Sequence, residues 1–110
     1  MKSFKSYQHR RILTKEGQVA SGDYNIDGEM TIRIQDGYLN DAEDADGILL
    51  PAIAAADGSH IEHWKNGVLH CETEPAVIDL TDKYEEWWLN GRQVERQVPK
   101  PTTEQNGSIA

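Results

Sequence analysis

Two adjacent stretches decide the fold: PAIAAADGSHIEHWKNGVLHCETE at positions 51–74 and PAVIDLTDKYEEWWLNGRQVERQV at positions 75–98. They align without a gap, and they share an opening Pro-Ala, a Glu-x-Trp in the second half and the Asn-Gly that follows it. Internal repetition at this period, 24 residues, is typical of supersecondary units that bury their faces by stacking on one another. We therefore expect two copies of one structural unit to lie side by side.

Each copy has the pattern of a β-hairpin. Pro51 and Pro75 open the first strand, where a missing N–H does little harm. The second strand ends in Trp-x-Asn-Gly, and Asn-Gly is the strongest short hairpin signal because both residues accept the left-handed backbone of a type I′ turn. Side chains alternate between the two faces of a strand, so His60, Glu62 and Trp64 are predicted to share one face.

The most regular strand pattern lies upstream of the repeats, at residues 29–35. Met30, Ile32 and Ile34 alternate there with polar residues, which predicts one buried face and one solvated face. Asp36-Gly37 follows as a turn signal. The N-terminal third is therefore expected to hold strands that do not belong to the repeat.

The segments between these strands are less regular. Residues 11–21 predict an early hairpin around Glu16-Gly17, and residues 36–47 predict an exposed acidic loop. Residues 48–56 are predicted as one strand rather than a helix, because Pro51 interrupts them. Asn40 precedes Pro51 as Asn66 precedes Pro75, which suggests an earlier unit with a two-residue insertion.

The predicted fold class is mainly β, an antiparallel sheet of repeated hairpins in units of about 24 residues, followed by a flexible C-terminal tail. We expect one domain over residues 1–98. Its expected parts are N-terminal strands in 1–36, an acidic loop and strand in 37–50 and two repeats in 51–98, with a disordered tail in 99–110.

The repeat resembles a known family. Trp64-Lys-Asn-Gly-Val-Leu-His-Cys-Glu-Thr-Glu-Pro-Ala76 is similar to MORN-like repeats, which read roughly Trp-x-Leu-Asn-Gly-x-x-His-Arg-x-x-Gly-Pro-Ala. Residues 75–78 and 85–91 follow the same pattern, whereas Glu74 stands where the family has Gly. Such repeats occur in many uncharacterised bacterial and phage proteins. The resemblance covers less than half of the chain and implies a β-sheet scaffold of phage or mobile-element origin, without an active site.

Charge is distributed unevenly along the chain. The net charge is −8, but residues 1–15 carry five bases and no acid, whereas residues 16–86 carry seventeen acids and three bases. An acidic body of this kind attracts basic partners over long range and repels phosphates and anionic lipids. We therefore expect a basic protein surface as partner, such as that of a nucleic-acid-binding protein, and no direct binding to nucleic acid or membranes.

The only cluster that resembles metal ligands is His60, His63, His70 and Cys71. The repeat alignment places its three histidines on packing positions of the second copy, and strand alternation sends His60 and His63 to opposite faces. Cys71 has no evident third group to orient His70 as a base. The acids between 41 and 46 do not have the spacing of an EF-hand loop. We expect no metal, no cofactor and no enzymatic activity.

One cysteine in 110 residues leaves no partner for an internal disulfide, which is typical of a reducing compartment. The chain also has no apolar run of the length that crosses a membrane, and its first residues do not read as a signal peptide. These observations predict a cytoplasmic protein.

Two functions are compatible with these features. The first is a non-enzymatic acidic module that binds a partner protein, in its sharpest form an inhibitor that imitates nucleic-acid charge, as anti-restriction and anti-CRISPR proteins do. The alternative is a structural or assembly protein that self-associates through sheet edges or exposed tryptophans. The predicted partner-binding residues are Asp41, Glu43, Asp44, Asp46, Glu72, Glu74, Glu85, Glu86 and Trp87.

Overall fold

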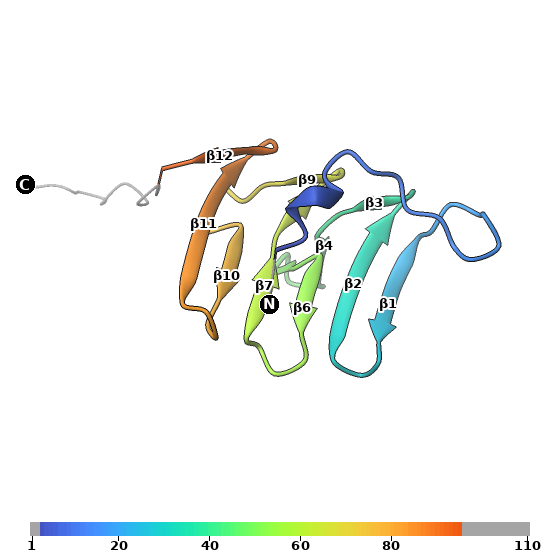
Figure 1. The fold of residues 1–110 in the computed structure, drawn as a ribbon, viewed down its shortest axis with the longest axis horizontal. Helices are drawn as coiled ribbons and strands as arrows, with labels where there is room; N and C mark the ends of the chain where they lie inside the picture. The colour runs from blue at the N-terminus through green and yellow to red at the C-terminus, as the bar shows by residue number, and fades with distance from the viewer. Residues whose placement is uncertain (1–2, 96–110) are drawn as a thin grey trace, which may run out of the picture.

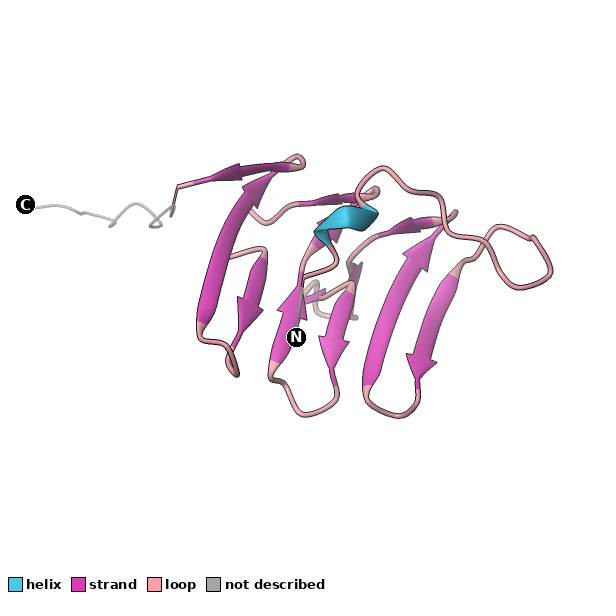
Figure 2. Cartoon of the chain, viewed as in Figure 1, coloured by secondary structure: helices cyan, strands magenta, loops and turns pink. Residues whose placement is uncertain are grey.

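The computed structural model describes residues 3–95, so the predicted disordered tail at 99–110 lies outside the described part. The chain is mainly β and antiparallel, as the sequence predicted (Figures 1 and 2). No helix within residues 3–95 is long and apolar enough to cross a membrane. The elements are η1 (Lys5–Tyr7), β1 (Gly22–Ile26), β2 (Met30–Gln35), β3 (Tyr38–Leu39), β4 (Ala42–Glu43), β5 (Leu49–Leu50), β6 (Ile53–Ala55), β7 (His60–Glu62), β8 (Trp64–Lys65), β9 (Val68–Leu69), β10 (Val77–Asp79), β11 (Tyr84–Leu89) and β12 (Arg92–Val94).

Most of the strands form one sheet of neighbouring hairpins. Its order is β1-β2-β6-β7-β10-β11-β12, and β3 pairs with β2 off this path. Strands that follow each other along the chain thus lie next to each other, except where β3, β4, β5, β8 and β9 turn away from the main ladder (Figure 1). The two predicted repeats are β6 to β9 and β10 to β12.

The N-terminal third contains a third copy of the unit, which the sequence reading placed outside the repeat. Asp36 and Gly37 have φ angles of 51° and 90°, and the two Asn-Gly turns have 50° and 87°, then 50° and 85°. All three are the left-handed pairs that a type I′ turn requires. We call β1 to β3 unit one, β6 to β9 unit two and β10 to β12 unit three.

The suggestion that Asn40 marks an earlier unit is therefore wrong. Asp36-Gly37 occupies the place of Asn66-Gly67, and thirty residues separate the two turns where 24 separate Asn66-Gly67 from Asn90-Gly91. Unit one is followed by six additional residues, not two. The sequence comparison missed this equivalence because Asp36 takes the turn position of the asparagines.

The additional residues form a small hairpin rather than an open loop. β4 pairs with β5, with Glu43 opposite Leu49, and this hairpin lies behind the main sheet in Figure 1. The single strand predicted at 48–56 is thus two strands that belong to different sheets. The chain changes sheet at Pro51, which has no N–H to give to a ladder, and at Ala52, whose N–H donates to the Asp41 carboxylate (2.8 Å).

In each unit the turn glycine donates its N–H to the segment that precedes the unit, which is the N-terminal segment for unit one and the previous unit for units two and three. These glycines are closely approached: a Cβ on Gly67, whose φ is already +87°, would come within 2.8 Å of the Tyr38 ring. These turns therefore need glycine both for the backbone angle and for the close approach. The repeated bonds run from Gly37 N–H to Ala20 O (2.8 Å), from Gly67 N–H to Leu39 O (2.9 Å) and from Gly91 N–H to Leu69 O (2.9 Å).

Residues 4–12, which we call the N-terminal strap, cross the end of the sheet at which the three turns lie. The early hairpin predicted at 11–21 is reduced to a single bridge between Leu13 and Val19. The strap satisfies the carbonyls of the three turn glycines. Ile12 N–H donates to Gly37 O (2.6 Å), His9 N–H to Gly67 O (2.8 Å) and Gln8 Nε2 to Gly91 O (3.5 Å).

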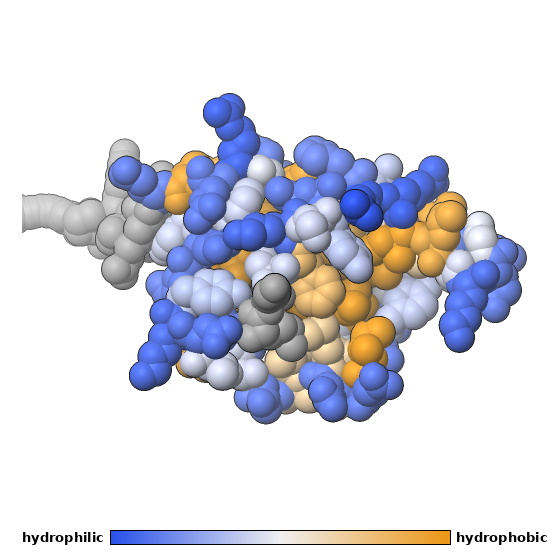
Figure 3. Space-filling view, in the orientation of Figure 1, coloured by the Kyte–Doolittle hydropathy of each residue, from blue (hydrophilic) through white to orange (hydrophobic). Residues whose placement is uncertain are grey.

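The core lies between the strap and one face of the sheet, which we call the front face. The strand register aligns one front-face row as Tyr24, Ile32, Ile53, Glu62, Val77 and Glu86. The row is apolar in unit one and carries carboxylates in units two and three. Figure 3 shows the same change on the surface, with apolar side chains over β1 and β2 and hydrophilic ones over β10 and β11.

Candidate functional site

Asp41, the second residue after β3, makes several hydrogen bonds within the fold, although it is one of the predicted partner-binding residues. Its Oδ1 accepts the N–H groups of Ala52 (2.8 Å) and Trp64 (2.9 Å), and its Oδ2 accepts a hydrogen bond from His63 Nδ1 (2.6 Å). Its side chain is only 9% exposed. This carboxylate therefore ties the end of unit one to the residue before β6 and to the first residue of β8.

His63 connects Asp41 to a second predicted residue, Glu74. Its Nε2 lies 3.3 Å from Glu74 Oε1, so that each ring nitrogen faces a carboxylate. Burial lowers the pKa of His63, but the hydrogen bond from its Nδ1 to Asp41 and the negative charge of both carboxylates outweigh burial, so the pKa is raised. The Asp41–His63–Glu74 chain lies on the rear face of the sheet, opposite the strap.

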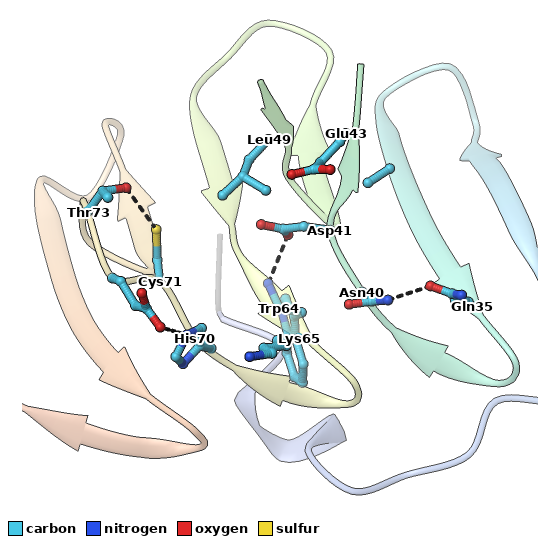
Figure 4. Close-up of a pocket in the computed structure, with 12 residues that line it drawn as sticks. Gln35, Asn40, Asp41, Glu43, Leu49, Trp64, Lys65, His70, Cys71 and Thr73 are labelled. Carbon is cyan, nitrogen blue, oxygen red and sulfur yellow. Dashed lines mark hydrogen bonds and ion pairs between the residues drawn. The ribbon is translucent and has the colours of Figure 1, made fainter. Parts of the chain in front are cut away.

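Beside this chain lies an open groove of about 500 Å³, which we call the rear groove. Figure 4 shows Glu43 and Leu49 of the β4–β5 hairpin on one side of it and His70, Cys71 and Thr73 on the other. Glu43 and Glu72 are exposed. Its charged and titratable lining side chains are Asp41, Glu43, Lys65, His70, Cys71 and Glu72.

The tip of the β4–β5 hairpin holds two further predicted residues. Asp44 Oδ1 accepts the N–H groups of Asp46 (2.8 Å) and Ile48 (3.0 Å), so this carboxylate organises the turn. Asp46 is exposed. The hairpin is therefore an ordered acidic projection whose shape depends on one of its own acids.

The remaining predicted residues lie on β11, away from the rear groove. Glu86 is on the front face, where it accepts a hydrogen bond from Trp88 Nε1 (3.0 Å) and lies 3.5 Å from Lys5 Nζ. Glu85 is exposed, whereas Trp87 is buried, with an exposure of 8%. The nine predicted residues thus separate into a set around the rear groove and a set on β11.

Sequence reasoning missed a buried cluster on the front face, formed by His60, Glu62 and Asp79. His60 Nε2 lies 2.6 Å from Glu62 and His60 Nδ1 lies 2.8 Å from Asp79. The other Glu62 contacts are the Trp64 indole N–H (3.0 Å) and the Phe4 N–H of the strap (2.9 Å). The sequence signal for this cluster was Glu62, an acid that alternation places between His60 and Trp64 on the same face of the strand.

The electrostatics of this cluster favour a charged imidazole between two carboxylates. Burial lowers the pKa of His60, but the hydrogen bonds to Glu62 and Asp79 outweigh burial and the pKa is raised. The Asp82 backbone N–H, 2.6 Å from Asp79, is the main cause that lowers the pKa of Asp79 to about 2. All three side chains are almost fully buried, so a substrate has no access to them.

The Cys71 and His70 pair does not form a nucleophile and base. His70 Nδ1 accepts the Asn90 N–H (2.9 Å) and its Nε2 lies 3.2 Å from Glu72, while Cys71 Sγ faces Thr73 Oγ1 (3.8 Å). No group of three His, Cys, Asp or Glu side chains within residues 3–95 is arranged to hold a metal ion. The chemistry that the rear groove offers is the binding of cationic groups by exposed carboxylates.

No family model, curated protein or solved structure matches the chain.

Proposed function

We propose that the protein is a non-enzymatic interaction module that binds the basic surface of a partner protein in the rear groove. The observation that supports this most directly is that two exposed acids line one groove, Glu43 from the β4–β5 hairpin and Glu72 from the segment after β9. Two carboxylates across a gap can each accept hydrogen bonds from an inserted arginine or lysine. Glu74, held through His63, adds a third acid nearby.

The partner class follows from charge. With fourteen more acids than bases between residues 16 and 86, the field of the protein steers basic surfaces toward it. Proteins that bind nucleic acids present such surfaces, and a partner of this class would lose access to its nucleic acid. The proposed role is therefore inhibition of a nucleic-acid-binding protein by charge mimicry, in a protein of phage or mobile-element origin.

The test is a pull-down from cells of the native host, identification of the partner, and titration of the purified pair. Replacing Glu43 and Glu72 with Gln removes two charges from the groove and keeps the fold, because neither is among the acids that bind backbone. We expect affinity to fall at least about tenfold, since two charge-assisted contacts are lost. Competition by duplex DNA tests the mimicry.

The matched control is Glu16→Gln with Asp27→Asn, which removes two exposed charges elsewhere in the chain. We expect a change of less than about threefold, because only the long-range field is altered. Equal losses in the two double variants would mean that net charge, and not the groove, binds the partner. Unchanged binding in the groove variant would reject the groove.

The assembly alternative now depends on the sheet edges. All three tryptophans are buried, with exposures of 1%, 8% and 8%, so none offers an exposed contact. Within residues 3–95, β1 and β12 are the two end strands of the sheet order. Sedimentation velocity in high salt tests this alternative, because a salt-resistant oligomer would favour self-assembly over binding of a basic partner.

A further inference from the structure

We propose that the protein also binds a small aromatic carboxylic acid, in an apolar cavity on the front face of unit one. This site is separate from the rear groove and does not depend on the function proposed above.

The cavity lies between the strap and strands β1 and β2, and its volume is about 450 Å³. This volume is within the range of about 300–1,000 Å³ typical of small-molecule sites. Two of its lining residues, Leu13 and Ile26, are about half exposed, and apolar atoms dominate this part of the surface in Figure 3. Its lining includes Leu13, Lys15, Ala20, Ile32, Ile34 and Leu39.

The repeat explains why there is space here. Ile34 is opposite Leu39 in the register of unit one, just as Trp64 is opposite Leu69 in unit two. The indole of Trp64 is 1% exposed and belongs to the core. Unit one keeps the same backbone but has a branched aliphatic side chain in place of an indole. The cavity adjoins the position at which the neighbouring unit holds a flat aromatic ring.

The comparison of units one and two also indicates which polar group the ligand carries. In unit two, Glu62 accepts the Trp64 indole N–H, whereas unit one has Ile32 in place of Glu62. Among residues 3–95, no carboxylate lines the cavity, and Lys15 is the one charged residue that does. Lys15 belongs to the N-terminal stretch that carries five bases and no acid. A flat ring with an anionic group at the cavity mouth fits these walls, because the ring is buried and the acid faces Lys15.

The experiment titrates the full chain with indole-3-acetate and follows backbone and methyl shifts by NMR. We expect saturable shifts confined to the cavity, including the methyl groups of Ile32, Ile34 and Leu39. Ile34→Trp fills the cavity with the side chain of the neighbouring unit and is expected to abolish binding. Leu49→Trp adds the same ring at the rear groove and is the matched control, which should bind normally.

A rim variant keeps the test informative if Ile34→Trp does not fold. Leu13→Asp removes an apolar wall at a position that is 54% exposed and places a negative charge where the ligand acid would lie. We expect binding of indole-3-acetate to be lost while the spectrum of the folded protein is kept. Normal binding in a folded Leu13→Asp variant would overturn the proposal.

Two ligand comparisons test the chemical class. Lys15→Gln should weaken indole-3-acetate about two- to fivefold and leave neutral indole unchanged, with Lys65→Gln as the control lysine on the rear face. Octanoate, an aliphatic acid, should bind more weakly than indole-3-acetate. The absence of saturable shifts at millimolar ligand, shifts that map to the rear groove, or octanoate binding as tightly would each overturn the proposal.

Discussion

Units one and two have the same backbone arrangement, but the side chains on their front faces differ in polarity. In unit one, Ile32 and Ile34 line an apolar cavity, and in unit two His60, Glu62 and Trp64 form a hydrogen-bonded polar core. The register and the turn angles are the same in both. The hairpin is therefore specified by its turns and alternation, while the interior of each unit tolerates either chemistry.

The difference predicts how each unit responds to substitution. Truncating a side chain in an aliphatic row should lower the free energy of unfolding in proportion to the contacts removed. Truncating a member of a buried polar row should lower it more, because the remaining members lose hydrogen-bond partners where water does not replace them.

The largest expected effect is that of Glu62→Ala. This change removes the acceptor for His60 Nε2, the Trp64 indole N–H and the Phe4 N–H together. We expect a loss of about 3–5 kcal/mol in the free energy of unfolding, the range found when one partner of a buried ion pair is deleted. Chemical denaturation measures the loss. Ile32→Ala, at the equivalent position of unit one, should cost less than about 2 kcal/mol because Ile32 is only partly buried beside a cavity. Similar losses in the two variants would contradict the predicted difference between the units.

The two junctions between units should also differ in how much they contribute to the free energy of unfolding. Asp41 and Cys71 occupy equivalent positions, because the Asp41 N–H donates to Trp64 O (2.8 Å) and the Cys71 N–H to Trp88 O (3.1 Å). Only Asp41 also binds two backbone N–H groups of the next unit through its side chain. We expect Asp41→Ala to cost about 2–3 kcal/mol and Cys71→Ala about 1 kcal/mol by the same measurement. Equal costs would show that the hydrogen bonds of the Asp41 carboxylate to the two backbone N–H groups add little to stability.

The polar core of unit two should also respond to pH. His60 has a raised pKa when folded, so its contribution to stability is complete below the ordinary histidine value and is lost as pH rises through the folded pKa. Asp79 has a lowered pKa, about 2, so its contribution is complete above the ordinary aspartate value and is lost as pH falls toward 2. Unfolding free energy measured against pH should decrease on both sides of a maximum between about pH 4 and 6.5.

The raised pKa of His63 adds to the decrease at high pH. His60→Gln should make the alkaline decrease shallower, with the part due to His63 remaining. A stability that is independent of pH between 5 and 9 would contradict the charged imidazole in both places.

The smallest expected effect is that of Lys5→Gln. The Lys5 ammonium lies 3.5 Å from Glu86, the unit three equivalent of Glu62, but its side chain is half exposed. A pair of this kind contributes less than about 0.5 kcal/mol, and salt screens it. A loss above about 1 kcal/mol on denaturation would mean that unit three has the same polar core as unit two.

The parts of the fold that follow from local rules could be predicted from the sequence. The Asn-Gly turns, the strand at 30–35 and the shared face of Glu62 and Trp64 all depend on turn chemistry and alternation. Unit one was missed because Asp36 replaces the asparagine and because six inserted residues shift the period. The sharp changes of direction around Pro51 depend on contacts between distant residues, which local patterns do not contain.

The candidate site shows the same limit. Exposed acids such as Glu43 and Glu72 could be chosen from charge, but their meeting across a groove depends on where the inserted hairpin folds back. Asp41 was predicted from its charge and Trp87 as a partly exposed aromatic, and the structure buries both. Composition does not distinguish a carboxylate that faces solvent from one that binds backbone N–H groups.

The strap has a consequence for how the protein forms during translation. Gln8 leaves the ribosome early, yet one of its partners is Gly91, which is made more than eighty residues later. Each hairpin can close as soon as it emerges, because its contacts are local. The strap, by contrast, can bond to Gly37 and Gly67 once their turns exist, but it completes its contacts only when the third turn has been made. Nascent chains halted before this turn would therefore hold the strap less firmly over the apolar front face of unit one, which chaperones and proteases would then reach more easily.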